Sequence, residues 1–291
     1  MMRKFVSVCV LLAGGFPVIV QAQENPLLDY EFWETATTED EVSLLLDRGA
    51  DIESRDKDGW TPLHWAAGFS KTPKVVALLL DRGADIEARA EGGITPLHVA
   101  TGFSKTPEVV ELLLDRGADL ESRDENGVTP LYGAVAFSEN LEVVSLLLDR
   151  GADIESRDKD GWTLMHWAAV FSENPEVVSL LLDRGADIES RAGHGVTPLH
   201  QAAAKSTTRE VVSLLLDRGA DIESRDEKGW RPLHHAAKFS KTPEVVLLLL
   251  DRGANAKAQI ADTVTPFDLV KENEYLKNTK AYWLLNEAQY R

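Results

Sequence analysis

The sequence has little cysteine, little positive charge and no long apolar run. Cys9 is its single cysteine in 291 residues, so one copy of the chain cannot form an internal disulfide. Lys and Arg total 31 against 48 Asp and Glu, giving a formal net charge of −17. Because this charge repels phosphates and anionic lipid, we expect no nucleic-acid partner and a preference for basic partners.

Motifs for catalysis and cofactor binding are also absent. The chain contains no P-loop, no Gly-x-Ser-x-Gly elbow and no His-Glu-x-x-His pattern. The segments 56–59 and 158–161 suggest calcium loops, but Ser54 and Ser156 replace the first Asp of such a loop. Trp65 and Trp167 stand where its bidentate Glu belongs. We therefore expect no metal, no cofactor and no enzymatic activity, with an enzyme of unrecognised site as the alternative.

The first 22 residues differ from the rest. Arg3 and Lys4 precede a mostly apolar stretch that ends in the small-residue site Val20-Gln21-Ala22. This order predicts a cleaved signal peptide, residues 1–22. An uncleaved anchor is the alternative, but Gly14, Gly15 and Pro17 interrupt a stretch shorter than the ~20 residues that span a bilayer. Cleavage would remove the only thiol, consistent with a periplasmic or secreted protein.

A 34-residue repeat organises the remaining chain. The string Leu-Leu-Leu-Asp-Arg-Gly-Ala occurs seven times, with its glycine at positions 49, 83, 117, 151, 185, 219 and 253. The string Thr-Pro-Leu-His, or a variant of it, precedes each copy after the first. Such spacing indicates stacked structural units rather than independent domains.

Each unit predicts two helices and a turn. Thr61-Pro62 starts a first helix, because Thr can cap free amides and Pro has none to leave unpaired. Thr72-Pro73 starts a second helix in the same way. Gly83 then suits the left-handed residue that ends a helix, and an extended stretch with a turn follows. One unit cannot bury its own apolar face, so neighbours must stack into one continuous core.

This pattern resembles the ankyrin repeat, with its Thr-Pro-Leu-His signature. The resemblance implies an all-α repeat solenoid of helix-turn-helix units with β-hairpin fingers. We expect an N-terminal capping repeat at 23–55, six repeats at 56–259, and a C-terminal capping repeat and helix at 260–291. The segment 69–73 replaces the usual Gly-His-Leu between the helices and lengthens that loop.

The motif histidines are candidates for metal ligands, but their geometry argues against that role. Equivalent residues of stacked repeats lie roughly 8–10 Å apart, whereas zinc needs nitrogens at about 2.0–2.1 Å. The resemblance implies instead that these histidines bond to the backbone and tie neighbouring repeats together. They are His64, His98, His166, His200 and His234.

Positions that differ between copies are free of the demands of stacking and are candidates for recognition. They fall at the fingertips and in the first helices, which in ankyrin proteins line the concave groove. An apolar stripe with aromatic anchors and a charged rim suits a protein interface, although the tryptophans could equally pack between fingers. The predicted partner-binding residues are Lys57, Asp58, Trp60, Trp65, Ile94, Val128, Trp162, Trp167, Trp230 and His235.

The sequence thus predicts an exported ankyrin-repeat scaffold that binds a partner protein in its concave groove. We expect a monomer, with no stable membrane insertion after signal cleavage. A secreted effector acting on host proteins is the alternative.

Overall fold

The computed structural model describes residues 25–34, 38–137, 140–172, 174–206, 209–261 and 263–290. The predicted signal peptide, residues 1–22, lies outside this range. Within it, no helix is both long and apolar enough to cross a membrane.

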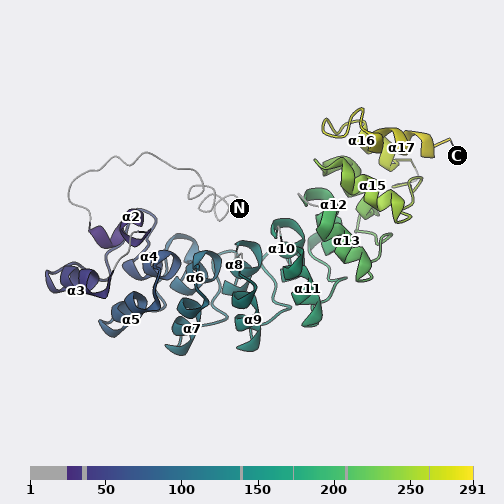
Figure 1. Ribbon diagram of the computed structural model, residues 1–291. Coiled ribbons are helices and arrows are strands. Elements are labelled where there is room, and N and C mark those ends of the chain that lie inside the picture. Colours follow the sequence, from purple (N-terminus) through teal and green to yellow (C-terminus); the bar gives the residue numbers. More distant parts are fainter. Residues whose placement is uncertain are drawn as a thin grey trace.

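The chain folds into two parallel rows of short helices (Figure 1). We call the first helix of each repeat the inner helix and the second the outer helix. The inner helices are α4 (Pro62–Phe69), α6 (Pro96–Phe103), α8 (Pro130–Phe137), α10 (Leu164–Phe171), α12 (Pro198–Lys205) and α14 (Pro232–Phe239). The outer helices are α5 (Pro73–Asp81), α7 (Pro107–Asp115), α9 (Leu141–Asp149), α11 (Pro175–Asp183), α13 (Arg209–Asp217) and α15 (Pro243–Asp251).

These helices form six inner–outer pairs in the described residues, which we number as the first to sixth repeats. At one end they are flanked by η1 (Pro26–Leu28), α2 (Tyr30–Glu34) and α3 (Glu39–Asp47). At the other end lie α16 (Pro266–Val270) and α17 (Lys280–Ala288). Each helix packs on its counterparts in adjacent repeats. The stack bends with the inner helices on the inside of the bend (Figure 1). The predicted all-α solenoid is confirmed.

The expected apolar faces meet in one core that runs the length of the stack. In the first repeat, Leu63 and Ala66 of the inner helix and Val76 and Leu79 of the outer helix are fully buried. The same cluster of buried side chains extends from Leu27 to Leu285. No repeat therefore has a core of its own, and stability depends on neighbours.

Outer helices end as their sequence predicts. Gly83 adopts a φ of +94°, and the amide of Ala84 donates to the carbonyl of Leu79 at 3.0 Å. This is a Schellman motif, which satisfies carbonyls at the helix end. The residue before this glycine pairs outward: Arg82 bonds to Asp47 of the preceding helix α3 at 2.8 Å. The Asp-Arg string thus makes ion pairs between repeats rather than within one.

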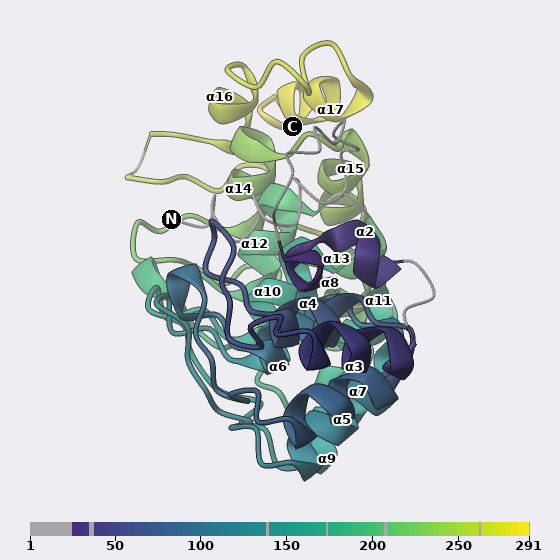
Figure 2. The same ribbon diagram turned by 90° about the vertical axis from the view of Figure 1, so that its left-hand side faces the viewer.

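The segment that precedes each of the six inner helices projects from one side of the stack (Figure 2); we call these segments fingers and number them with their repeats. They are tight turns rather than extended hairpins. In the first finger the amide of Asp56 donates to the carbonyl of Trp60 at 3.0 Å. No regular strand forms within the described ranges, where one isolated bridge joins Ile260 and Val264. Single backbone bonds link neighbouring fingers, such as Glu91 N–H to Asp58 O at 2.9 Å.

The motif histidines link neighbouring repeats. His64 Nδ1 accepts the amide of Thr61 at 3.2 Å, which completes a cap on α4. Its Nε2 then faces the carbonyl of Ile94 in the next finger at 3.0 Å. Because Nδ1 is the acceptor, Nε2 carries the proton and donates. Each such ring therefore starts its own helix and holds the following finger.

Candidate protein-interaction surface

The predicted recognition residues lie on the fingers and inner helices, but the structure buries them to different degrees. Lys57 and Asp58 are exposed at the tip of the first finger. Ile94 is half-buried in the second finger, and Val128 in the third is only 3% exposed. The tips are therefore open to a partner, whereas the residue after the turn glycine is half-buried in the second finger and buried in the third.

The first repeat carries a packed aromatic cluster. Trp60 is 6% exposed and contacts Trp65, with 4.8 Å between ring centroids. It also stacks on Phe69 at 6.4 Å and packs with Ala90 and Val99 of the second repeat. Most of the Trp60 surface is thus used inside the stack, which favours its packing role.

In the fourth repeat the two tryptophans differ in exposure. Trp162 is half-buried, and the ammonium of Lys205 lies 5.4 Å from its ring centroid. Trp167 is 5% exposed and meets the buried Tyr132 edge-on at 5.4 Å. Trp162 therefore offers more surface to a partner than Trp167 does.

The sixth repeat is the most open. Trp230 and His235 are half-buried, and their rings meet at 5.4 Å. Trp230 also stacks on Phe239 at 6.0 Å, and Phe239 is 52% exposed. The equivalent Phe69 is covered by Tyr30 at 5.0 Å and by Phe103 at 5.8 Å. Sequence reasoning did not include Phe239, because a phenylalanine ends nearly every inner helix.

A carboxylate at the base of certain fingers positions these aromatic residues. Asp56 Oδ1 accepts the amides of Asp58 and Trp60, both at 2.9 Å. Its Oδ2 accepts the indole N–H of Trp65 at 3.0 Å. One side chain therefore shapes the finger and fastens it to the inner helix; we call this arrangement the carboxylate clamp.

The clamp recurs where the inner helix offers a donor. Asp158 binds the indole of Trp167, and Asp226 binds Nε2 of His235, each at 3.0 Å. In the second and fifth repeats Ala90 and Ala192 replace the aspartate, and the inner helix presents Val99 and Gln201. The sequence contains a pattern that could have predicted the clamp: an Asp stands nine residues before a Trp or His.

The third repeat is the exception, because Asp124 faces Gly133, which has no side chain to donate. Asp124 still accepts the amides of Asn126 and Val128 at 2.7 and 2.8 Å. Its finger is thus shaped in the same way but is not fastened to the inner helix.

The pKa values of the motif histidines are shifted by burial in the stack. Burial lowers the pKa of His64, His166, His200 and His234 from 6.5 to about 4. These rings cap helices and bind backbone, and no reactive group adjoins them in an open site. Within the described ranges, no three His, Cys, Asp or Glu side chains gather as a metal site.

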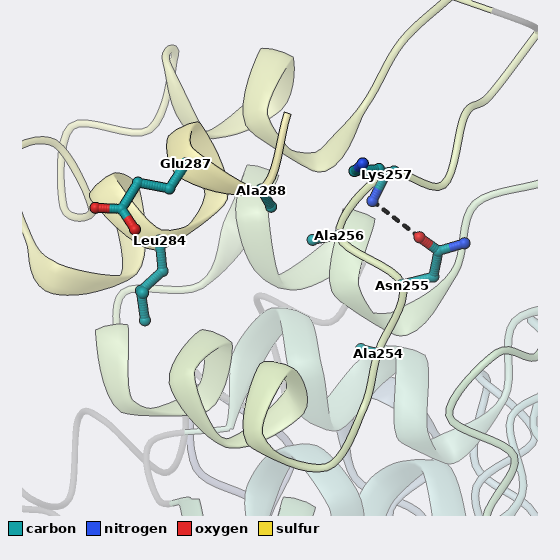
Figure 3. A pocket seen from close by; sticks show the side chains of 7 residues that line it. All are labelled: Ala254, Asn255, Ala256, Lys257, Leu284, Glu287 and Ala288. Atoms are coloured by element: carbon teal, nitrogen blue, oxygen red, sulfur yellow. Dashed lines mark hydrogen bonds between the residues drawn. The ribbon is translucent and has the colours of Figure 1, made fainter. Parts of the chain in front are cut away.

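A shallow pocket of about 400 Å³ lies at the C-terminal end, away from the predicted residues (Figure 3). Ala254, Ala256, Leu284 and Ala288 line it, and the amide of Lys257 bonds there to Asn255 Oδ1 at 2.9 Å. In earlier fingers an isoleucine or leucine stands where Ala256 does. The pocket reflects the missing side chain and the end of the stack, and it gathers no reactive groups.

Comparisons with known proteins agree with the architecture. A family model described as ankyrin repeats (3 copies) matches residues 35–124, 97–192 and 189–260. The fold is similar to the human ASB11 ankyrin repeat domain, with a TM-score of 0.66 and 25% identity. That match covers 79% of this chain and 98% of the other. No curated protein sequence matches the chain.

Proposed function

Since this chain belongs to the ankyrin-repeat family, we propose that it is an exported protein that binds another protein through its inner surface. Ankyrin repeats are protein–protein interaction modules and form a typical non-enzymatic scaffold. Stacked repeats present extended surfaces on the inside of their bend.

One observation carries this proposal: residues that stack are the same in nearly every copy, and most of the changes between aromatic, aliphatic and polar side chains lie in the fingers and inner helices. The buried Val and Leu of the outer helices recur, as do the Asp-Arg pairs. The finger and inner-helix positions change from Trp to Val, Gly, Gln or His. Variation concentrated on one surface is expected if that surface recognises something other than the next repeat.

Trp162 and Trp230 are the anchors that we propose for the partner. Both are half-buried, and aromatic side chains of this kind dominate many protein interfaces. Trp60 and Trp167 are less accessible, and their rings pack beneath the exposed side chains of this surface. Lys57 and Asp58, exposed on the first fingertip, belong to the polar rim.

A capture experiment with matched variants tests this surface. The chain from residue 23 onward is immobilised and exposed to the periplasm or culture medium of its source. We expect Trp162→Ala and Trp230→Ala to weaken capture of a specific protein by tenfold or more, the order expected for a hot spot. Trp283→Ala removes a 49% exposed indole from α17 and serves as the control. Equal capture by all three would contradict the proposal.

Export is proposed from the residues 1–22 alone. Expression of the full chain with fractionation tests it: we expect a protein that begins near Gln23 outside the cytoplasm. Recovery of the intact chain in the cytoplasm would contradict export without affecting the binding proposal. Delivery into a host cell, as an effector, would appear in the same experiment.

A further inference from the structure

The sixth repeat combines exposed aromatic surface with positive charge, which is unusual in so acidic a chain. Phe239 is 52% exposed, and in the described residues it is the one large apolar side chain of an inner helix that is so open. The cause lies in the next repeat. Asn273 stands where another phenylalanine would cover it, and its amide donates to the carbonyls of Ala237 and Ser240.

Two lysines flank this aromatic surface. Lys205 lies over the ring of Trp162, and Lys228 lies at the tip of the sixth finger. Burial lowers the pKa of His235, the hydrogen bond and charge of Asp226 oppose this shift, and the charges of Lys205 and Lys228 add to it. Lys205 holds in α12 the position that Phe239 holds in α14, and these helices pack together, while Lys228 stands two residues before Trp230; both lysines therefore adjoin this surface. We call Lys205, Lys228, Trp230, His235 and Phe239 the sixth-repeat patch.

Two carboxylates near the patch are engaged, and a third, Glu227, is 68% exposed at the fingertip. Asp226 binds His235 at 3.0 Å, Glu227 lies 3.6 Å from Nδ1 of His194, and Glu272 pairs with Lys238. Other titratable groups facing His235 are the neutral rings of His200 and His234. Neither Lys205 nor Lys228 makes an ion pair with any residue that the structure describes. The patch thus offers two cations and one exposed carboxylate, that of Glu227.

We propose that the sixth-repeat patch binds an acidic polypeptide segment that carries an aromatic or large aliphatic side chain. That side chain would pack on Phe239 and Trp230, and flanking carboxylates would meet Lys205 and Lys228. This inference rests on the proposed binding function and specifies its partner at one end of the inner surface. The net charge of −17 favours basic partners at long range. At physiological ionic strength, salt screens exposed charges more than about 8 Å apart. The charges that directly contact the bound segment therefore determine which segment the patch prefers.

Fluorescence anisotropy with three short synthetic peptides tests the proposal on the chain from residue 23. The first contains glutamates around a Leu-Phe pair, the second replaces the glutamates by lysines, and the third replaces Leu-Phe by Ser-Ser. We expect the first to bind more tightly than the other two by about tenfold, because each lacks one of the two contacts. Equal or tighter binding of the lysine peptide, or no binding of the first, would overturn the proposal.

Variants of the chain locate the binding. The double change Lys205→Glu with Lys228→Glu, and separately Phe239→Ala, should each weaken the acidic peptide about tenfold. The matched controls are Lys105→Glu, an exposed lysine of the second repeat, and Leu44→Ala, a 48% exposed leucine on α3. Equal losses in the controls would overturn the assignment.

Two further results distinguish a failure of this inference from a failure of the proposed binding function. If the captured protein still depends on Trp162 but is indifferent to Lys205 and Lys228, the binding function stands and the acidic class is wrong. If sedimentation shows a dimer that Phe239→Ala dissolves, the patch belongs to a second copy of the chain, and the proposal fails.

Discussion

At the scale of single residues, the carboxylate clamp explains why particular tryptophans occur where they do. Asp56 holds Trp65 by its indole N–H, and Asp158 holds Trp167 in the same way. Each bond joins a finger to the helix behind it, so the ring is oriented by chemistry as well as by packing. A hydrogen bond to a charged acceptor contributes about 1.5–3 kcal/mol.

Removing the donor while keeping an aromatic ring isolates this contribution. We expect Trp65→Phe to lower the free energy of unfolding by about 1 kcal/mol more than Trp60→Phe in urea denaturation. Trp60 and Trp65 belong to the same cluster, but only Trp65 has its indole N–H on a carboxylate there. Equal losses would show that the clamp adds nothing to stability.

Tyr132 is a residue whose role the sequence pattern obscures. It stands in the place of a motif histidine and is fully buried. Its hydroxyl lies 2.6 Å from the carbonyl of Ser156 and 2.8 Å from that of Trp162. It therefore links the third repeat to the fourth, as the histidines do elsewhere, so the position is not a degenerate one.

Loss of this hydroxyl should be costly. We expect Tyr132→Phe to lower the free energy of unfolding by about 1–2 kcal/mol, because it takes the hydroxyl donor away from the carbonyl of Ser156. Differential scanning fluorimetry against Tyr275→Phe, a 60% exposed tyrosine, provides the comparison. An unchanged midpoint for Tyr132→Phe would contradict the role of this hydroxyl as a link.

At the scale of the fingers, turn glycines report how closely neighbours approach. Gly127 and Gly229 have nearly the same φ, +80° and +77°. A Cβ on Gly127 would lie 3.2 Å from the amide nitrogen of Lys159, whereas one on Gly229 would meet nothing within 4 Å. The difference arises because Gly229 belongs to the last of the six fingers. The segment before α16, which follows it, does not approach this glycine as the next finger approaches Gly127.

This pair separates backbone strain from finger contact. We expect Gly127→Ala to cost about 1 kcal/mol or more beyond the cost of Gly229→Ala in urea denaturation, because overpacking adds to the shared strain. Equal costs would mean that the fingers yield readily to each other.

The helices and their boundaries could be predicted from sequence, and the exposure of the tryptophans could not. Thr61-Pro62 and Gly83 determine their local conformation through their own chemistry, so they act alike in every copy. Whether Trp60 faces solvent depends on Ala90 and Val99, which arrive from the next repeat. Phe239 is open because Asn273 replaces the phenylalanine of the next repeat and bonds to the backbone at Ala237 and Ser240, which no local pattern indicates.

At the scale of the whole molecule, the buried histidines make stability depend on pH. Folding lowers the pKa of four of them to about 4, and that of His98 is also lowered. Between pH 4 and 6.5 the unfolded chain therefore binds more protons than the folded one. This stabilisation is complete above pH 6.5 and is lost as the pH falls toward 4.

We expect the urea midpoint to fall steadily from pH 7 to pH 4.5, since each pKa unit contributes about 1.4 kcal/mol per histidine. His200→Gln, already destabilised at pH 7, should show a shallower decline because it has one fewer group to protonate. A midpoint that is flat over this range would contradict the neutral, hydrogen-bonded state of these rings.

We propose that recognition takes place on the fingers and inner helices, while the outer helices hold the stack together. Hydrogen–deuterium exchange on the chain, free and bound to its captured protein, tests this claim directly. We predict slowed exchange in the fingers and inner helices around Trp162 and Trp230, with the outer helices unchanged. Protection confined to the outer helices and their Asp–Arg pairs would contradict it.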